Sequence, residues 1–568
     1  MMRNQPPQWY LGLDWSGAGL QASLAQYPQG SVHPLIWLHG SQRHDTYPVH
    51  LRANPDSSLS VMNLDFVASV HTPSQTTMLN WVDLYPHLRR AVPFFRRRQH
   101  QWYPALGLPG GSAGGQSLLL QDLKQTVQAV LQRIIPTPDQ PVCGQNLSGA
   151  TFRDALQQLA GVVIACPATW GATYRFNLRE AILSTRLVET PDQVLCVDSP
   201  LAIALAYQAQ NRASAEIVVR SQDRTTLSLY INTAITEVAS WTESLADAQF
   251  HPHKSHVEGY NYGVSGLQED VFYQLLYPQW LPHQDFLTTF DWQFPKVGAP
   301  DFPQRDRATL SLTNHAMGST VLTLARQVLL ILYHRPTVAA QLGMHSWQVH
   351  QRQLAQTLLP GVTATLNHSI NKLLSRQGQT SRQVRQLLWQ PQAWQGLAPL
   401  LTSWLQTKFP QARLVAVTAR LADGLALLPS FPVSLERHQH QYDDYFLLRE
   451  LLQAINTETT TLSEVCQNLR RQGLHTKDCR DRIAQFLAGY TPPGWTPDTA
   501  DPWISPESQA TVEYQALRSQ PLFVPNPEHP GQFHCDARQR RRAIQYLEQI
   551  CAHSHQKLND PLLLPWSL

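Results

Sequence analysis

Two apolar runs, each followed directly by a helix signal, constrain the fold of this 568-residue chain more than any other feature. The runs are 161–166 and 194–198, and the spacing of apolar residues after them predicts helices over 172–187 and 200–210. Strands joined by helices pair in parallel, because a short hairpin cannot connect them. The sequence therefore predicts an α/β protein with a parallel portion in its sheet.

Short strands are expected to open both halves of the chain, since alternating apolar runs are separated there by glycine and proline signals. The expected strands are 9–14, 21–27, 35–39, 216–221, 225–231, 235–241, 385–389 and 413–417. The other expected helices are 117–134, 266–277, 317–334, 347–375, 394–407 and 419–428. Two halves that open alike indicate an internally repeated fold.

The pattern predicts three parts. Residues 1–212 form a first lobe and 213–430 a second, whose closing segment at about 413–430 packs back on the first. Residues 431–568 form a helical C-terminal region, with a capping box at Thr461-x-x-Glu464. Residues 279–308, rich in proline, glutamine and aromatic residues, are expected to be an insertion or a long loop.

The overall composition excludes few classes of protein. The 43% of hydrophobic residues can supply real cores, and the formal charge of +3 with a pI near 8.4 is too mild to indicate a nucleic-acid or membrane partner. Seven cysteines form no C-x-x-C pair, which favours reduced structural thiols. No signal peptide and no apolar run long enough to span a bilayer is visible, so a cytoplasmic protein without an integral membrane segment is expected.

The residues around the two parallel strands carry a family resemblance. The chain has Cys166-Pro-Ala-Thr-Trp-Gly-Ala-Thr-Tyr-Arg175 after the first strand and Asp198-Ser-Pro-Leu-Ala-Ile-Ala-Leu-Ala-Tyr207 after the second. This ordered pair resembles V-P-A-x-F and E-P-T-A-A-A-L-A-Y of the heat-shock-70 chaperones. The resemblance spans roughly residues 8–430 and implies a two-lobed, actin-like (ribonuclease-H-like) ATPase fold, with a helical C-terminal region in place of the peptide-binding module.

The same resemblance implies a nucleotide cleft. Leu11-Gly-Leu-Asp14 looks like the start of the family's G-I-D-L-G-T-T, with Asp14 on its acidic position. The turn Ser16-Gly17-Ala-Gly19 still offers backbone N–H groups to an anion. Asp198 lies beside the second acidic position, and Thr225 matches the threonine of D-L-G-G-G-T. We expect these residues, Asp14, Ser16, Gly17, Gly19, Asp198 and Thr225, to form a vestigial nucleotide cleft.

Most positions that serve ATP in the family hold other residues here. Arg220-Ser-Gln-Asp-Arg-Thr225 stands for D-L-G-G-G-T, and Ser199 for the glutamate of E-P-T-A-A. Gln390-Pro-Gln392 replaces the adenosine-binding G-G-S, and no lysine precedes Lys124. An arginine in the place of the family's catalytic lysine is not equivalent to its compact ammonium group. We therefore expect no catalytic residue, no metal site and no cofactor, with ATP or ADP as the alternative.

Other motifs have simpler explanations. Arginines cluster at Arg89-Arg90, at Arg96–Arg98 and at Arg538 with Arg540–Arg542, which a solvated surface also explains. Helices near 462–472 and 477–488 match a helix-turn-helix, or an αα-hairpin without a DNA-binding role. Cys551-x-His553-x-His555 and His534-Cys535 lack the paired spacing of zinc sites.

The function expected from these observations is a scaffold, chaperone-like or assembly-related, with a degenerate ATP site that binds a protein partner. One alternative is an active or rewired ATP-binding chaperone, which would retain Asp14 and Thr225. A second alternative is a nucleic-acid adaptor that uses the arginine clusters, although nucleic acid is not the expected partner.

Overall fold

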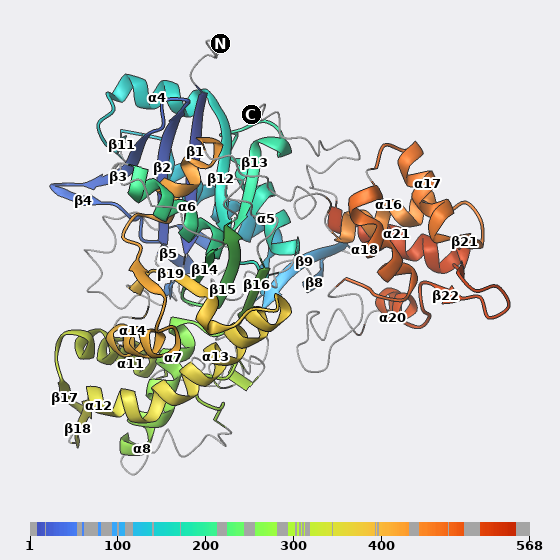
Figure 1. The fold of residues 1–568 in the computed structure, drawn as a ribbon. Coiled ribbons are helices and arrows are strands. Elements are labelled where there is room, and N and C mark those ends of the chain that lie inside the picture. Colours follow the sequence, from blue (N-terminus) through green and yellow to red (C-terminus); the bar gives the residue numbers. More distant parts are fainter. Residues whose placement is uncertain are drawn as a thin grey trace.

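The computed structural model of the chain describes most of both halves and of the C-terminal region (Figure 1). The described residues are 8–16, 19–53, 59–61, 78–80, 94–98, 101–107, 117–138, 141–170, 172–212, 224–243, 256–280, 294–300, 304–305, 308, 312, 318–342, 345–391, 394, 397–430, 442, 444–474, 476–492, 510 and 512–551. They form a mixed α/β protein, as the strand–helix alternation predicted.

The first sheet begins with an antiparallel meander of β1 (Gln8–Ser16), β2 (Gly19–Tyr27) and β3 (Ser31–His39). Strands β12 (Leu159–Cys166) and β13 (Val194–Asp198) then add in parallel beside β1. Both strands are almost entirely buried, which is typical of parallel strands covered on both faces. The strand order is β11-β3-β2-β1-β12-β13, with β11 (Val142–Gly144) and β4 (Gln42–His44) as short edge strands.

The helices of this first unit confirm the predicted alternation. They are α3 (Leu120–Leu131), α4 (Gly149–Gln157), α5 (Ala172–Ser184) and α6 (Ser199–Arg212), with short 3-10 turns at Gln132–Ile134 and Pro191–Gln193. The expectation of a helix from residue 117 is wrong at its start, since Ser117–Leu119 form strand β10. A three-residue apolar strand that leads directly into a helix has no periodicity of its own, so the pattern merged the two.

The second sheet repeats the arrangement of the first. Strands β14 (Arg224–Ile231), β15 (Thr236–Glu243) and β16 (His256–Tyr260) form an antiparallel meander. Strands β19 (Val384–Trp389) and β20 (Arg413–Ala416) add in parallel beside β14, which gives the order β16-β15-β14-β19-β20. The third strand of this meander follows the β14–β15 hairpin, and the strand predicted at 216–221 lies outside the described residues.

Helices and a hairpin complete the second unit. They are α7 (Val264–Val271), a π-helical turn Phe272–Leu276, α8 (Tyr277–Trp280), α11 (Gly318–His334), β17 (Thr337–Leu342), β18 (His345–His350), α12 (Gln351–Gln353), a second π-helical turn Leu354–Leu358, α13 (Leu359–Arg376), a 3-10 turn Ser381–Gln383 and α14 (Ala398–Lys408). The helix expected from residue 347 begins at Gln351, because His345–His350 pair with β17 as a strand. The part of 279–308 that the structure describes contains no strand.

Helix α15 (Leu421–Ala426), followed by a 3-10 turn at Leu428–Ser430, lies against the first sheet although it follows the last strand of the second. Its backbone contacts β1 so closely that a Cβ added at Gly12 would lie 2.1 Å from the carbonyl oxygen of Ala422 and 2.4 Å from the nitrogen of Ala426. Helix α6 is equally close on another side, where Gly424 approaches the backbone of Ala206. The end of the second unit therefore packs on the first.

The C-terminal unit contains the predicted helices and also a small sheet that the sequence analysis did not predict. Its helices are α16 (Asp444–Ala454), α17 (Leu462–Arg471), α18 (Thr476–Leu487), α20 (Val512–Arg518) and α21 (Ala537–Cys551). Its strands are β21 (Thr459–Thr461), β22 (Val524–Pro525) and β23 (Gln532–His534). Strands this short are invisible to alternation patterns. The capping box is confirmed, since Glu464 N donates to Thr461 Oγ1 at 3.2 Å and Thr461 N to Glu464 Oε2 at 2.9 Å.

Two further small sheets come from the segment between β4 and α3. One contains β5 (His50–Ala53), β6 (Leu59–Val61) and β7 (Met78–Asn80). The other contains β8 (Phe94–Arg98), β9 (Gln101–Gly107) and β10. In Figure 1, β8 and β9 reach from the first unit toward the C-terminal unit, and β9 contacts both α3 and α21.

The close approach of α15 to β1 leads to a stability prediction. Replacing Gly12→Ala forces the backbone of α15 away from the sheet, so we expect the free energy of unfolding to fall by about 1–3 kcal/mol, as in overpacked cores. The urea midpoint of the full chain measures the change. Gly149→Ala is the matched control, because a Cβ there has no neighbour within 4 Å. Equal midpoints for the two variants would contradict the packing described for α15.

Candidate functional site

The candidate site lies where the carboxyl ends of the first sheet's parallel strands meet the second sheet. Because β1, β12 and β13 run in parallel, Asp14, Cys166 and Asp198 come to one edge of the first sheet. The β14–β15 hairpin lies at the carboxyl end of β14. The loop after β12 crosses to this second sheet, where Thr169 contacts Glu237. Ligands of open α/β sheets commonly bind at such carboxyl edges.

The turn of the β14–β15 hairpin is closed by its own side chain. Asn232 Oδ1 accepts hydrogen bonds from the backbone nitrogens of Ala234, at 2.8 Å, and Ile235, at 2.9 Å. Asn232 Nδ2 donates to the hydroxyl of Tyr230 at 3.2 Å. Asparagine favours turns for this reason, since its amide bonds the backbone that follows it. The backbone N–H groups of Ala234 and Ile235 are therefore paired within the turn.

Backbone N–H groups at the start of helix α7 are hydrogen-bonded to the β14–β15 hairpin. The backbone nitrogen of Val264 donates to the carbonyl oxygen of Asn232 at 3.0 Å, and that of Ser265 to Thr233 at 2.9 Å. The first N–H groups of a helix commonly attract anions such as phosphate. These two are already bonded to the hairpin, so α7 fastens the turn instead of presenting these donors to a ligand.

Glu237 joins the two sheets. It is fully buried, and its Oε1 accepts hydrogen bonds from Thr169 N at 2.7 Å and from Thr169 Oγ1 at 2.8 Å. Beside it, the indole nitrogen of Trp170 donates to Asn261 Oδ1 at 3.3 Å. We call Thr169, Trp170, Glu237 and Asn261 the inter-sheet latch, because the first two belong to the loop after β12 and the last two to the second unit.

Two buried carboxyl groups at this edge have strongly perturbed acidity. Burial raises the pKa of Asp14 to about 7, and among the described residues no atom hydrogen-bonds its Oδ1. Burial also raises the pKa of Glu237 to about 7, against the opposing effect of the Thr169 donors. The phenol of Tyr230 is affected by both carboxylates: its pKa is raised well above the usual range by burial first, and then by the charge of Asp14.

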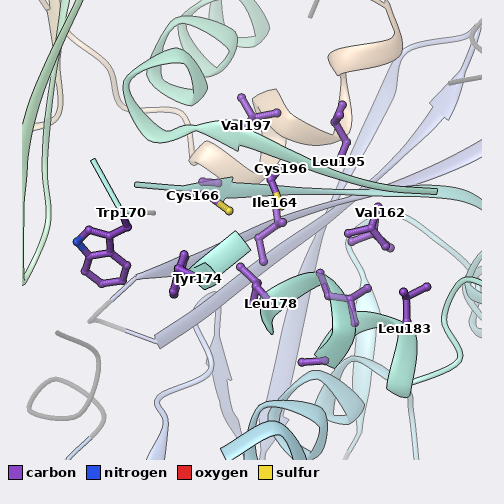
Figure 2. Packing of buried hydrophobic residues seen from close by; sticks show 14 of the residues in the cluster. Val162, Ile164, Cys166, Trp170, Tyr174, Leu178, Leu183, Leu195, Cys196 and Val197 are labelled. Atoms are coloured by element: carbon purple, nitrogen blue, oxygen red, sulfur yellow. The ribbon is translucent and has the colours of Figure 1, made fainter. Parts of the chain in front are cut away.

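Asp198 forms an ion pair with Arg175. Arg175 Nη2 donates to Asp198 Oδ1 at 2.5 Å, which ties helix α5 to the end of β13. Figure 2 shows the neighbouring thiols of Cys166 and Cys196 on adjacent strands, with Trp170 and Tyr174 in the same apolar cluster. Burial raises the pKa of Cys166, and a hydrogen bond with Cys196 raises it further. Both thiols are buried core groups, and Asp198 is paired with Arg175.

The structure brings some of the predicted site residues together. Asp14 and Asp198 lie at the same edge of the first sheet. Ser16 ends β1 opposite Gly19 in the β1–β2 hairpin, and Gly17 lies outside the described residues. Gly19 has a φ of 135°, and a Cβ there would lie 2.3 Å from the carbonyl oxygen of Tyr47, so this glycine permits a close approach between strands.

Thr225 does not lie at the edge of the sheet that carries Asp14. It is near the start of β14, paired with Val384, whereas the hairpin is at the other end of the strand. A strand rises about 3.3 Å per residue, which places Thr225 roughly 16 Å from Tyr230 along β14. The structure therefore does not bring Thr225 to the edge that carries Asp14.

Sequence reasoning missed the residues that fill this edge: Thr169, Tyr230, Asn232 and Glu237. It matched the second phosphate segment to 220–225, of which 220–223 lies outside the described residues. The repeated strand order instead makes the β14–β15 hairpin the counterpart of the β1–β2 hairpin. A signal existed, because the predicted strands 225–231 and 235–241 leave a short turn that begins with Asn232.

Several groups that could contact a ligand at this edge are bonded within the protein. The backbone nitrogens of Ala234, Val264 and Ser265 donate to protein oxygens, and Asp198 is paired with Arg175. Within the part of the chain that the structure describes, no group of three or more His, Cys, Asp or Glu residues is placed to hold a metal ion.

The sequence matches no protein-family model and no curated protein. Of the helices in the described ranges, none has the length and apolar character needed to cross a bilayer. The functional argument therefore rests on the geometry of this edge and on the motifs in the sequence.

The raised acidities of Asp14 and Glu237 predict a pH-dependent stability. Their pKa values in the folded chain lie above the ordinary values of 3.8 and 4.5, so folding favours the protonated forms. This contribution is complete below about pH 4 and is lost as the pH rises through about 7, and each group contributes on the order of 3 kcal/mol. We expect Tm to fall between about pH 5 and pH 8.

The variants Asp14→Asn and Glu237→Gln should each flatten that dependence, because neither amide ionises. Glu528→Gln, at an exposed position, is the control and should leave the profile as it is in the unsubstituted chain. Profiles of Tm against pH that stay parallel in all of these variants would show that the two buried carboxyls do not titrate as described.

Proposed function

We propose that this chain is a heat-shock-70-like scaffold that binds a protein partner and does not hydrolyse ATP. The observation that carries the proposal is the filled edge between the sheets, where Tyr230, Asn232 and Glu237 occupy positions that a nucleotide site would leave to glycine and ligand. A nucleotide that cannot enter the edge between the sheets cannot be hydrolysed there. We therefore infer that the two-sheet fold serves a different function.

The repeated sheet supports the actin-like part of this proposal. Each unit has two antiparallel neighbours on one side of its first strand and two parallel neighbours on the other, in the same order. Helix α6 lies between the units, and Ser228 Oγ of β14 donates to the carbonyl oxygen of Pro200 at 2.7 Å. A duplicated sheet with crossing helices is the architecture that the Cys166–Arg175 and Asp198–Tyr207 segments imply.

The loss of nucleotide chemistry is supported by the position of each hairpin. Asp14 precedes the β1–β2 turn, as the acidic residue of the family's first segment does in the resemblance. In the second unit, Tyr230 holds the position before the equivalent turn, and Asn232-Thr-Ala234 replaces a run of glycines. A phenol with a raised pKa is neutral at physiological pH, so it offers no negative charge to a magnesium ion.

A protein partner is favoured by the surface of the second unit. Helix α11 exposes Leu330, Ile331 and Tyr333, at 39%, 38% and 43% of their accessible area. Adjoining exposed apolar side chains of this size indicate an interaction surface more often than isolated ones do. A closed latch would hold this surface in one orientation relative to the first unit.

Nucleotide binding is tested directly by titration calorimetry with Mg-ATP and by phosphate release. We expect no heat of binding and no release above that of a heat-denatured sample, because the backbone donors at the edge are already paired. A nucleotide that bound the folded chain would raise Tm by mass action. Turnover above the denatured control would overturn the proposal, and a rise in Tm with ATP in EDTA would favour the rewired ATP-binding alternative.

The partner surface is tested by the pair of substitutions Leu330→Glu and Ile331→Glu. Both side chains are already exposed, so we expect the fold and Tm to be preserved while proteins retained from native extract by the unsubstituted chain are lost. Arg352→Glu, at an exposed position on α12, is the control for added negative charge. Unchanged retention by the α11 variant would remove this surface from the proposal.

A further inference from the structure

The C-terminal unit has the connectivity of a helix-turn-helix followed by a β-hairpin. Helix α16 leads through β21 into α17, and a turn at Gly473, with φ of 99°, leads into α18. Strands β22 and β23 then form a hairpin, and β23 pairs with β21, so that the sheet order is β21-β23-β22. From the sequence, a plain αα-hairpin over 462–488 was favoured over a helix-turn-helix. The added β-hairpin gives this unit more than an isolated helix pair.

Helix α18 presents a polar outer surface. Its buried apolar side chains are Cys479, Ile483, Phe486 and Leu487, which pack inside the unit. Arg480, Asp481 and Gln485 are exposed, and Arg482 is paired with Asp444. Arginine and glutamine are side chains that read base edges in the major groove, where the second helix of a helix-turn-helix lies. An apolar outer surface, which would indicate a protein partner, is not present on the described side chains of α18.

Tertiary structure also brings two distant arginine clusters together. Strand β8 carries Arg96, Arg97 and Arg98 and pairs with β9, and β9 lies against helix α21 of the C-terminal unit. Helix α21 begins with Arg538 and Arg541 at exposed positions. Its other two arginines are used inside the unit, since Arg540 donates to the carbonyl oxygen of Ile455 and Arg542 to that of Ala516. Segments about 440 residues apart in the sequence, each with an arginine cluster, thus lie side by side.

We propose that α18, the arginines of α21 and the β8–β9 hairpin together bind double-stranded DNA. In this arrangement α18 enters the major groove, and the arginines of β8 and α21 contact phosphates on either side. The exposed carboxylates of Asp481 and Glu528 oppose the phosphate charge, so the unit needs the β8 arginines for tight binding. Double-stranded RNA is disfavoured, because its major groove is too deep and narrow for a helix.

The test is fluorescence anisotropy of the full chain with a labelled mixed-sequence DNA duplex of about 30 base pairs, roughly three helical turns. We expect saturable binding whose association constant falls about five-hundredfold between about 50 and about 200 mM salt, as five arginine–phosphate contacts would give. The triple variant Arg96→Ala, Arg97→Ala and Arg98→Ala should lower the slope of log K against log salt by up to about 3.

A second variant separates groove contacts from phosphate contacts. Arg480→Ala should weaken binding at every salt concentration, and Arg352→Ala, a matched exposed arginine on α12 in the second unit, should leave it unchanged. Tm of each variant confirms that it folds. Absence of binding at the lowest salt, equal loss with Arg352→Ala, or preference for an RNA duplex would each overturn the proposal. None of these outcomes depends on whether the inter-sheet edge binds nucleotide.

Discussion

A buried carboxylate, Glu237, fastens the loop after β12 to the second sheet. Its Oε1 accepts both the backbone N–H and the hydroxyl of Thr169, so the loop after β12 is held against β15. A fully buried acid is costly unless its hydrogen bonds are satisfied, and burial leaves the second oxygen of Glu237 without a hydrogen-bond partner among the described residues. The raised pKa of Glu237 is the visible result of that balance. The position of the latch in turn decides what the edge between the sheets can admit.

The arrangement around this carboxylate repeats a simple plan twice. A meander and two parallel strands make each sheet, and α6 and α15 pack between them or back across the first. What differs between the two copies is the hairpin next to the edge. In the first unit Gly19 permits a close approach to Tyr47, whereas in the second Asn232 closes the turn with its own amide. Equivalent strand orders therefore carry different side-chain chemistry at the hairpin.

Local patterns predicted most helices and strands of the two large sheets, because periodicity and turn residues are properties of neighbouring residues. They failed where an element was too short to show a period, as in β10 and β21–β23. They also failed at the site. Asp14 and Asp198 lie near the carboxyl ends of predicted strands, and the family resemblance assigned both to one cleft. Thr225 was assigned to the same cleft by a motif match, but β14 places it at the far end of the strand.

The sequence by itself determined the class of fold, the capping box at Thr461 and the absence of any lysine before Lys124. These depend on residue identity and short spacing alone. Only the tertiary structure decided that Glu237 reaches Thr169, that Tyr230 lies near Asp14, and that the β9 strand lies against α21. Such contacts join residues separated by tens to hundreds of positions, and no local pattern encodes them. They arise from the packing of whole elements, which is where the function of this chain is decided.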